Sequence, residues 1–427
     1  MSSVRLERTI WPVGHGAFYT EQFKDERDRV LFTAAYDCGG RNQGVINPPI
    51  KTVTNNFTKP IDLLFISHFH ADHINGLPLL LDKKMVGRII LPQLAQEVVL
   101  EAIVYNFIQA SNGGSTLVDP NSDVLNLQTQ LINWLQEGAD NITQIVGENE
   151  NDEPQTIDIN EGREEDGVRS VPVNLNPTIH SGSQLCIKQS KNLIWRYIPV
   201  CYIDASNSAK LLDDFKGKYP NIVNEDDTIN WRTVVEILQE ELPKEERGKG
   251  KPKYKNIGEI KGIYENIFQV QKGEQPHNNY SMPVYSGPMI GISLRYARPC
   301  WWGNGGLMAD DIDILLRSEF NILANHSAHC LYTGDFEANV PAKLSKLKFV
   351  LQDLWAKVGL LQIPHHISDS NYSPDLYDHR MLCFGNVNDK GDECFTFDIW
   401  RKIIFVHHCP SMVVTEVNNV LQFEYHV

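Results

Sequence analysis

The stretch Ser67–His73 (SHFHADH) decides how this chain is interpreted. It follows directly on residues 61–66 (IDLLFI), which have the length and apolar composition of a buried strand. Three imidazoles and a carboxylate within six residues, on the turn that leaves a strand, cannot all be accommodated by packing. The stretch therefore predicts a metal site.

The order of the residues in this stretch indicates two ions rather than one. We expect His68 and His70 to point to one metal, and Asp72 and His73 to face a second. Imidazole nitrogens and a carboxylate oxygen suit zinc, or manganese and iron, which have similar demands.

Two later motifs also follow apolar, strand-like segments. The first is Tyr332–Asp335 (YTGD), after residues 328–332, and the second is Ile363–His366 (IPHH), after residues 360–363. Because it comes after the histidine cluster and before the second motif, Asp335 is a candidate metal ligand. The remaining segments alternate between strand-like and helical periodicity, which predicts the α/β class. Expected strands are residues 9–13, 17–20, 30–36, 86–91, 282–286, 291–296, 403–407 and 421–425, and expected helices are residues 74–81 and 93–109.

Composition excludes several classes of protein. The 427 residues are 42% hydrophobic and 22% charged, which is typical of a globular chain with a sizeable core. The N-terminus has no apolar signal segment and no run approaches 18 apolar residues, so we expect a cytoplasmic protein without a membrane span. Eight scattered cysteines, none in a CxxC pair, indicate buried thiols rather than a disulfide scaffold or a zinc knuckle.

With these motifs in this order, the chain resembles the metallo-β-lactamase superfamily, in which an HxHxDH motif lies at the end of a sheet strand. The resemblance implies an αββα sandwich with insertions over residues 1–427, and Asp335 as a bridging ligand. It also implies that Asp37, in the turn Asp37–Gly40, supports the site without binding metal. Of the two late histidines we favour His366 as the ligand and His365 as a supporting or proton-donating residue, although the assignment could be reversed.

The superfamily usually has a further histidine between the first cluster and the bridging aspartate. His277, in His277–Ser281 (HNNYS), fits that pattern, and His180 is its competitor. In the branch that this chain most resembles, the histidine is often absent, so a third outcome is that neither residue binds metal.

Two segments differ in composition from the rest. Residues 205–265 form an apparent insertion within the single domain, and it contains the Lys-rich run 244–255. Residues 148–166 include two acidic runs and are expected to be a solvated loop. Either segment is a candidate docking surface for a protein partner.

The branch in question contains the metallohydrolase domain of the bacterial DNA-uptake channel protein. That resemblance implies a phosphodiesterase or nuclease with two zinc ions, acting on nucleic acid or a nucleotide. Asp72 would orient the attacking water or accept its proton, and His365 would protonate the leaving oxygen. The formal net charge of −15 argues against a general attraction to nucleic acid. Hydrolysis of a carboxylic ester, lactone or thioester therefore stays open, as does a metal-binding sensor that acts through a protein partner.

Overall fold

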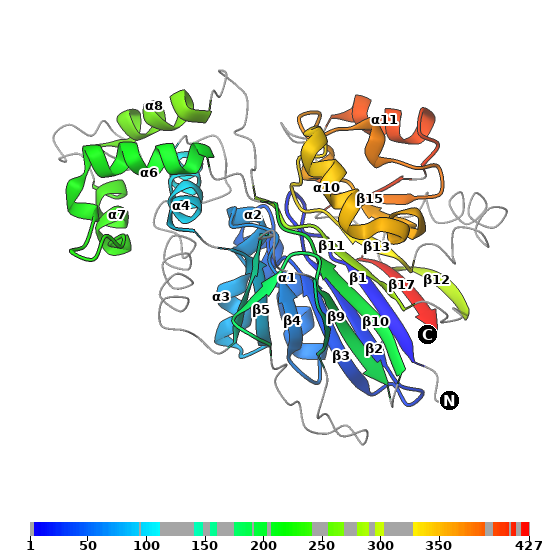
Figure 1. The fold of residues 1–427 in the computed structure, drawn as a ribbon. Coiled ribbons are helices and arrows are strands. Elements are labelled where there is room, and N and C mark those ends of the chain that lie inside the picture. The colour runs from blue at the N-terminus through cyan, green and yellow to red at the C-terminus, as the bar shows by residue number, and fades with distance from the viewer. Residues whose placement is uncertain are drawn as a thin grey trace.

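Two mixed β-sheets with helices on their outer sides organise the chain in the computed structural model (Figure 1). The structure describes residues 4–93, 95–111, 141–147, 154–159, 175–189, 192–202, 206–240, 255–268, 280–289, 295–302, 328–388, 396–409, 411–415 and 420–426. The expected α/β class is confirmed.

The first sheet is antiparallel on one side and parallel on the other. Strands β1 to β3 pair as an antiparallel meander, and β3, β4, β5, β6 and β8 then run parallel. Its order in the described part is β12 (Arg295–Trp302), β17 (Val420–His426), β1 (Arg5–Ile10), β2 (Tyr19–Lys24), β3 (Val30–Tyr36), β4 (Ile61–Phe65), β5 (Val86–Pro92), β6 (Ile142–Val146) and β8 (Thr178–His180).

The second sheet has its own parallel region, made of β13 to β16. Among described residues its order is β16 (Ser411–Val414), β15 (Leu382–Asn386), β14 (Leu360–Gln362), β13 (Cys330–Tyr332), β11 (Val284–Pro288), β10 (Asn192–Pro199), β9 (Gln184–Gln189) and β7 (Thr156–Asp158). Because parallel neighbours end at the same edge of a sheet, the turns after β3, β4, β13 and β14 can meet.

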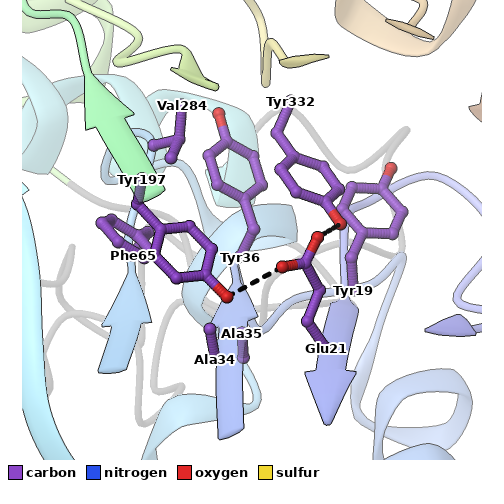
Figure 2. Close-up of a pocket in the computed structure, with 9 residues that line it drawn as sticks. All are labelled: Tyr19, Glu21, Ala34, Ala35, Tyr36, Phe65, Tyr197, Val284 and Tyr332. Atoms are coloured by element: carbon purple, nitrogen blue, oxygen red, sulfur yellow. Dashed lines mark hydrogen bonds between the residues drawn. The ribbon is translucent and has the colours of Figure 1, made fainter. Parts of the chain in front are cut away.

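The space between the two sheets is filled mainly by apolar and aromatic side chains from both. One carboxylate, Glu21, is buried among them, where it accepts hydrogen bonds from the hydroxyls of Tyr197 and Tyr332, each at 2.8 Å (Figure 2). The Arg8 guanidinium donates to the same carboxylate at 2.7 Å. A buried charge is tolerated when it is paired and hydrogen-bonded, so this cluster ties the two sheets together.

Helices cover the outer face of each sheet. On the first sheet these are α1 (Gln43–Asn56), α2 (Ala71–Ile74), α3 (Leu77–Asp82) and part of α4 (Gln96–Ser111). On the second sheet they are α10 (Pro341–Leu351), η2 (Gln352–Lys357) and α11 (Phe397–Phe405), and the short turns η3 (His365–Ile367) and η4 (Pro374–Leu376) belong to the same side. Apolar side chains of each helical layer pack on the sheet beneath it.

A separate helical unit lies against α4, where the sequence predicted an insertion over residues 205–265. It consists of α6 (Ser206–Lys218), η1 (Pro220–Ile222), α7 (Trp231–Leu238) and α8 (Ile257–Phe268), drawn in green in Figure 1. These elements share one apolar cluster with α4. Of the Lys-rich run 244–255, only Lys255 is within the described part.

Several expected elements differ from the observed ones. Residues 403–407 were expected to be a strand but mostly belong to α11, because Ile399 and Ile403 are four residues apart on its buried face. The expected helix over residues 74–81 is two short helices, α2 and α3. Of the acidic segment 148–166, residues 154–159 are described and contain β7, so that part is an edge strand. No helix in the part of the chain that the structure describes has the length and apolar character needed to cross a membrane.

Candidate metal centre

Four predicted site residues lie after β4, on the connecting loop and on the short helix α2 that follows it. His68, His70, Asp72 and His73 are all buried. The neighbouring parallel strand β3 ends beside β4 and is followed by Asp37, whose backbone N–H donates to Phe65 at 2.8 Å. The two strand ends thus bring Asp37 against the histidine loop.

Helix α4 braces the same loop from the outside. The Asn106 side chain accepts from the backbone N–H of Ala71 at 3.2 Å and donates to the backbone carbonyl of Phe69 at 2.9 Å. The Tyr105 ring stacks on His70, with centroids 3.9 Å apart. The orientation of the loop is therefore fixed by contacts on both sides.

The second sheet delivers the remaining residues. Asp335 follows β13, and its backbone N–H donates to the Ser281 hydroxyl at 3.0 Å. His366 follows β14, where the Gln362 amide oxygen accepts from the backbone N–H groups of Thr333 and Gly334. These bonds lock the turns after β13 and β14 to one another.

The Asp335 carboxylate lies between the predicted histidines. Its Oδ1 is 3.1 Å from Nε2 of His73 and 3.7 Å from Nε2 of His366, and its Oδ2 is 3.5 Å from Nε2 of His68. The Asp72 Oδ2 is 3.1 Å from Nε2 of His366 and 3.6 Å from Nε2 of His73. The potential donor atoms therefore surround two carboxylates.

The hydrogen-bond partners of Nδ1 in His73 and His366 determine whether the Nε2 of each ring can bind a cation. Nδ1 of His73 is 2.7 Å from Asp37 Oδ2, and Nδ1 of His366 is 3.1 Å from the backbone carbonyl of Asn386. Both partners only accept hydrogen bonds, so each Nδ1 carries a proton, and the Nε2 of a neutral ring has a lone pair. In both rings Nε2 lies 3.1 Å from a carboxylate oxygen. Two acceptors at this distance repel each other unless a proton or a cation lies between them.

Electrostatics favour the protonation states that a cation needs. Burial raises the pKa of Asp335, but His73, His365 and His68 outweigh it and hold this pKa well below the ordinary value. Burial likewise raises the pKa of Asp72, and the nearby histidines reverse that effect.

The histidine pKa values follow this pattern at His68, His70 and His366 but not at His73. Burial lowers the pKa of His70 and of His68, and it lowers that of His366 to about 4. Burial also lowers the pKa of His73, yet Asp335, Asp72 and Asp37 raise it well above the ordinary value overall. Without a metal, His73 therefore keeps a proton that a cation would displace.

Close backbone approaches and a strained turn help to build the site. A Cβ atom on Gly39 would lie 2.5 Å from the backbone carbonyl carbon of His73, so glycine is required there. The turn after β14 places His365, His366 and Ile367 in the left-handed region, with φ of 49°, 52° and 67°. Such conformations cost about 1–3 kcal/mol each in non-glycine residues and cluster at functional sites.

Three groups of side chains offer ligand atoms that all lie within 4.8 Å of one another. They are His68, His70 and Asp335; His73, Asp335 and His366; and His15, Asp72 and His366. Every predicted ligand within the described residues thus belongs to at least one of these groups. His15 is a further member that was not predicted.

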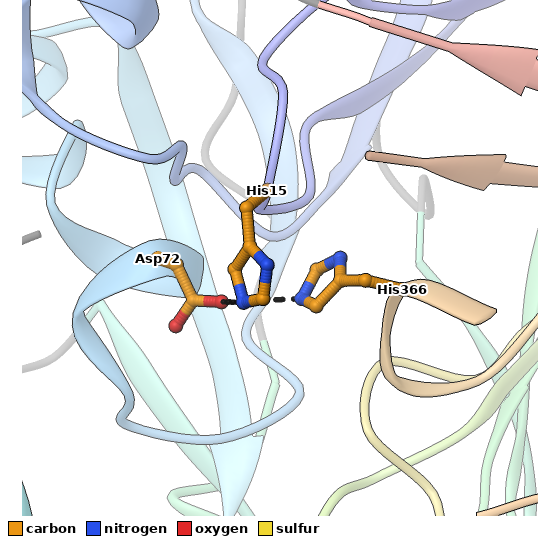
Figure 3. A group of neighbouring side chains, drawn as sticks. All are labelled: His15, Asp72 and His366. Carbon is orange, nitrogen blue, oxygen red and sulfur yellow. Dashed lines mark hydrogen bonds and ion pairs between the residues drawn. The ribbon is translucent and has the colours of Figure 1, made fainter. Parts of the chain in front are cut away.

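Sequence reasoning missed His15. Its ring lies beside that of His366, with centroids 3.9 Å apart, and its Nε2 is 3.3 Å from Asp72 Oδ2 (Figure 3). The signal in the sequence is Gly14-His15-Gly16, a histidine between two glycines at the turn that follows β1. Both glycines have positive φ, which lets this turn lie close to the Asp72 backbone.

The other candidate residues lie elsewhere or outside the described part. His277 is outside the described residues. His180 ends β8 and belongs to none of the three groups. His365 is also outside these groups: its Nδ1 is 3.2 Å from the Asn371 amide oxygen and its Nε2 is 3.8 Å from Asp335 Oδ2. The six cysteines whose side chains the structure describes are buried and unbridged, as expected, and none joins a group.

No protein-family model matches the chain, and no curated protein matches it either. The functional interpretation therefore depends on the geometry of this site and on the order of its motifs.

Proposed function

We propose that this chain is a metal-dependent hydrolase of the metallo-β-lactamase superfamily that binds two divalent cations. The observation that carries the proposal is that the Nε2 atoms of His73 and His366 each lie 3.1 Å from a buried carboxylate oxygen, within groups whose ligand atoms all lie within 4.8 Å of one another. A cation bound among these atoms would replace the proton on His73, and nitrogen and oxygen ligands suit zinc, or manganese and iron.

The arrangement of the sheets supports the assignment to this superfamily. Two mixed sheets pack face to face with helices outside, and the candidate ligands gather where the turns after β4, β13 and β14 converge. This arrangement supports the αββα sandwich with an edge site that the resemblance implies. A shared architecture does not specify a reaction, so the activity is argued from the site.

Each side chain has a separate part in the proposed reaction. One cation would be held by His68, His70 and Asp335, and the other by Asp72, His73, Asp335 and His366. When bound, the cations supply an acidified water and neutralise charge that develops on the substrate. Asp72 orients the attacking water or takes its proton.

We assign to His365 the delivery of a proton to the leaving oxygen, a step that requires its ring in the doubly protonated imidazolium form. The Asn371 amide oxygen holds its Nδ1 at 3.2 Å, which leaves Nε2 directed toward the Asp335 carboxylate at 3.8 Å. Its side chain is 12% exposed, so it lies at the edge of the site rather than beneath it.

The proposed substrate is a phosphodiester in nucleic acid or in a nucleotide. This choice comes from the motifs Pro364-His365-His366 and Asn278-Asn279-Tyr280-Ser281, which are similar to those of the branch that contains the DNA-uptake metallohydrolase domain. A small ester, lactone or thioester is the second candidate, and it is favoured by the net charge of −15, which gives no general attraction to a polyanion.

The test combines metal content with a substrate panel. The full chain, loaded with Zn²⁺ or Mn²⁺, would be assayed on bis-p-nitrophenyl phosphate, supercoiled DNA, RNA and a set of lactones. We expect phosphodiester cleavage that Asp335→Asn abolishes and that His379→Ala, at an exposed histidine, leaves intact. Turnover of lactones without cleavage of any phosphodiester would favour the ester, lactone or thioester substrates over the phosphodiester. One equivalent of bound metal or less, or no turnover of either class, would contradict the proposal.

A further inference from the structure

We propose that His15 is a ligand of the second cation site, which makes that site closed and leaves the water and the substrate to the first. This inference rests on the proposed two-metal function. It assigns a role to a residue in the turn after β1, a part of the chain that the motifs discussed above do not include.

The turn that carries His15 is anchored from two directions. The backbone N–H of His15 donates to the Asn388 side chain at 3.0 Å, beyond the end of β15. The backbone N–H of Ala17 donates to the backbone carbonyl of Asp72 at 3.3 Å. A Cβ on Gly16 would lie 2.7 Å from that same carbonyl, so the turn is packed directly on the ligand loop.

The ring of His15 points at the atoms that would hold the second cation (Figure 3). Its Nε2 is 3.3 Å from Asp72 Oδ2, and the Nε2 of His366 is 3.1 Å from the same oxygen. The Nε2 of His73 approaches that oxygen at 3.6 Å. Three imidazole nitrogens therefore converge on one carboxylate oxygen, and only 7% of the His15 surface is exposed.

The spacing of these atoms is that of ligands around one ion. The ligand atoms of His15, Asp72 and His366 all lie within 4.8 Å of one another. Donors that each lie about 2.1 Å from a zinc ion are separated by roughly 3–4 Å, so a small adjustment places all three in one coordination sphere.

Adding His15 makes the two sites unequal. The second site would have five protein ligands (His15, Asp72, His73, Asp335 and His366), whereas the first has three among the described residues (His68, His70 and Asp335). Closed metal sites are typically structural, and sites with an open position bind water or substrate. The cation between His68 and His70 is therefore the one that meets the substrate.

A competing role for His15 is to orient Asp72 through a hydrogen bond without touching the metal. His15→Gln separates the two roles, because the glutamine amide can still donate to Asp72 but is a poor zinc ligand. His15→Ala removes both functions. His379→Ala is the matched control, since that side chain is 72% exposed.

The experiment titrates metal-free full-length protein with Zn²⁺ against a chromophoric chelator, and records the visible spectrum of the Co²⁺ form. We expect two equivalents for the wild type and for His379→Ala. Both His15 variants should keep one equivalent and bind the second about 10–100-fold more weakly, with a changed Co²⁺ spectrum. His70→Ala should instead weaken the other equivalent.

Each result distinguishes this inference from the proposed function. If the wild type binds two equivalents and His15→Gln matches it in affinity and spectrum, His15 is not a ligand and only the inference fails. If the wild type binds one equivalent or none, the two-metal function fails and the inference fails with it. Circular dichroism of His15→Gln verifies that the variant is folded.

Discussion

The substitution Asp37→Asn tests how the site fixes the direction of its imidazoles. Asp37 is fully buried and accepts three hydrogen bonds. Its Oδ1 accepts from the Ser67 backbone N–H at 2.7 Å, and its Oδ2 accepts from the Ser67 hydroxyl at 2.8 Å and from His73 Nδ1 at 2.7 Å. Asp37 has φ of 54°, a conformation that asparagine tolerates as well as aspartate, so the exchange leaves the backbone preference intact.

An asparagine at position 37 cannot satisfy this set of donors. If its NH₂ group faces His73, the ring must move its proton to Nε2, where the proton occupies the lone pair that a cation needs. If the NH₂ group instead faces Ser67, two donors are buried against each other, which costs about 1–3 kcal/mol. We therefore expect metal affinity to fall by about 10–100-fold, which corresponds to about 1.4–2.8 kcal/mol.

The assay is a competition titration with Zn²⁺, together with thermal unfolding of the metal-free protein. Asp62→Asn is the control, because the Asp62 carboxylate also accepts from a backbone N–H, that of Thr33 at 2.8 Å, on the same sheet but at the far end of β4. It should bind metal like the wild type. Unchanged affinity in Asp37→Asn, or an equal loss in both variants, would refute the argument.

Three further results are expected. Burial raises the pKa of Glu101 to about 8, so the free energy of unfolding falls by a few kcal/mol as pH rises from about 4.5 toward 8. In denaturant melts from pH 5 to 8, this free energy should decline more steeply for the wild type than for Glu101→Gln, which keeps the contact with Ser208. Gly39→Ala forces a Cβ against the His73 backbone, and it should weaken metal binding at least tenfold in a Zn²⁺ titration while far-ultraviolet circular dichroism stays unchanged. Asp335→Asn removes the anion between both groups, and elemental analysis should find that neither ion survives gel filtration; retention of one full equivalent would show that Asp335 does not bridge.

The sequence predicted those site residues whose position follows from local structure. His68, Asp335 and His366 each come directly after a parallel strand, and parallel neighbours end at one edge. Apolar runs marked these strands because they are buried on both faces. The positions of the motifs relative to one another could therefore be predicted without knowing the structure of the loops that connect them.

Other features depend on contacts that a local pattern does not contain. His15 reaches the site because its turn packs on Asp72 and Asn388, which are far away in the sequence. Residues 403–407 contain a short apolar run that fits a strand or a buried helix face equally well. Packing against the second sheet stabilises the helix.

The turn that carries His366 shows why a motif can identify a ligand without specifying its geometry. Ile367 has φ of 67°, which is unfavourable for a β-branched residue, and no local preference would place it there. Its side chain is completely buried, and a Cβ on Gly385 would lie 2.9 Å from it. The Nδ1 of His366 is held at the same time by the Asn386 carbonyl of β15. Packing and this hydrogen bond therefore impose the strained turn from outside, and the direction of the His366 lone pair is a property of the second sheet rather than of the motif.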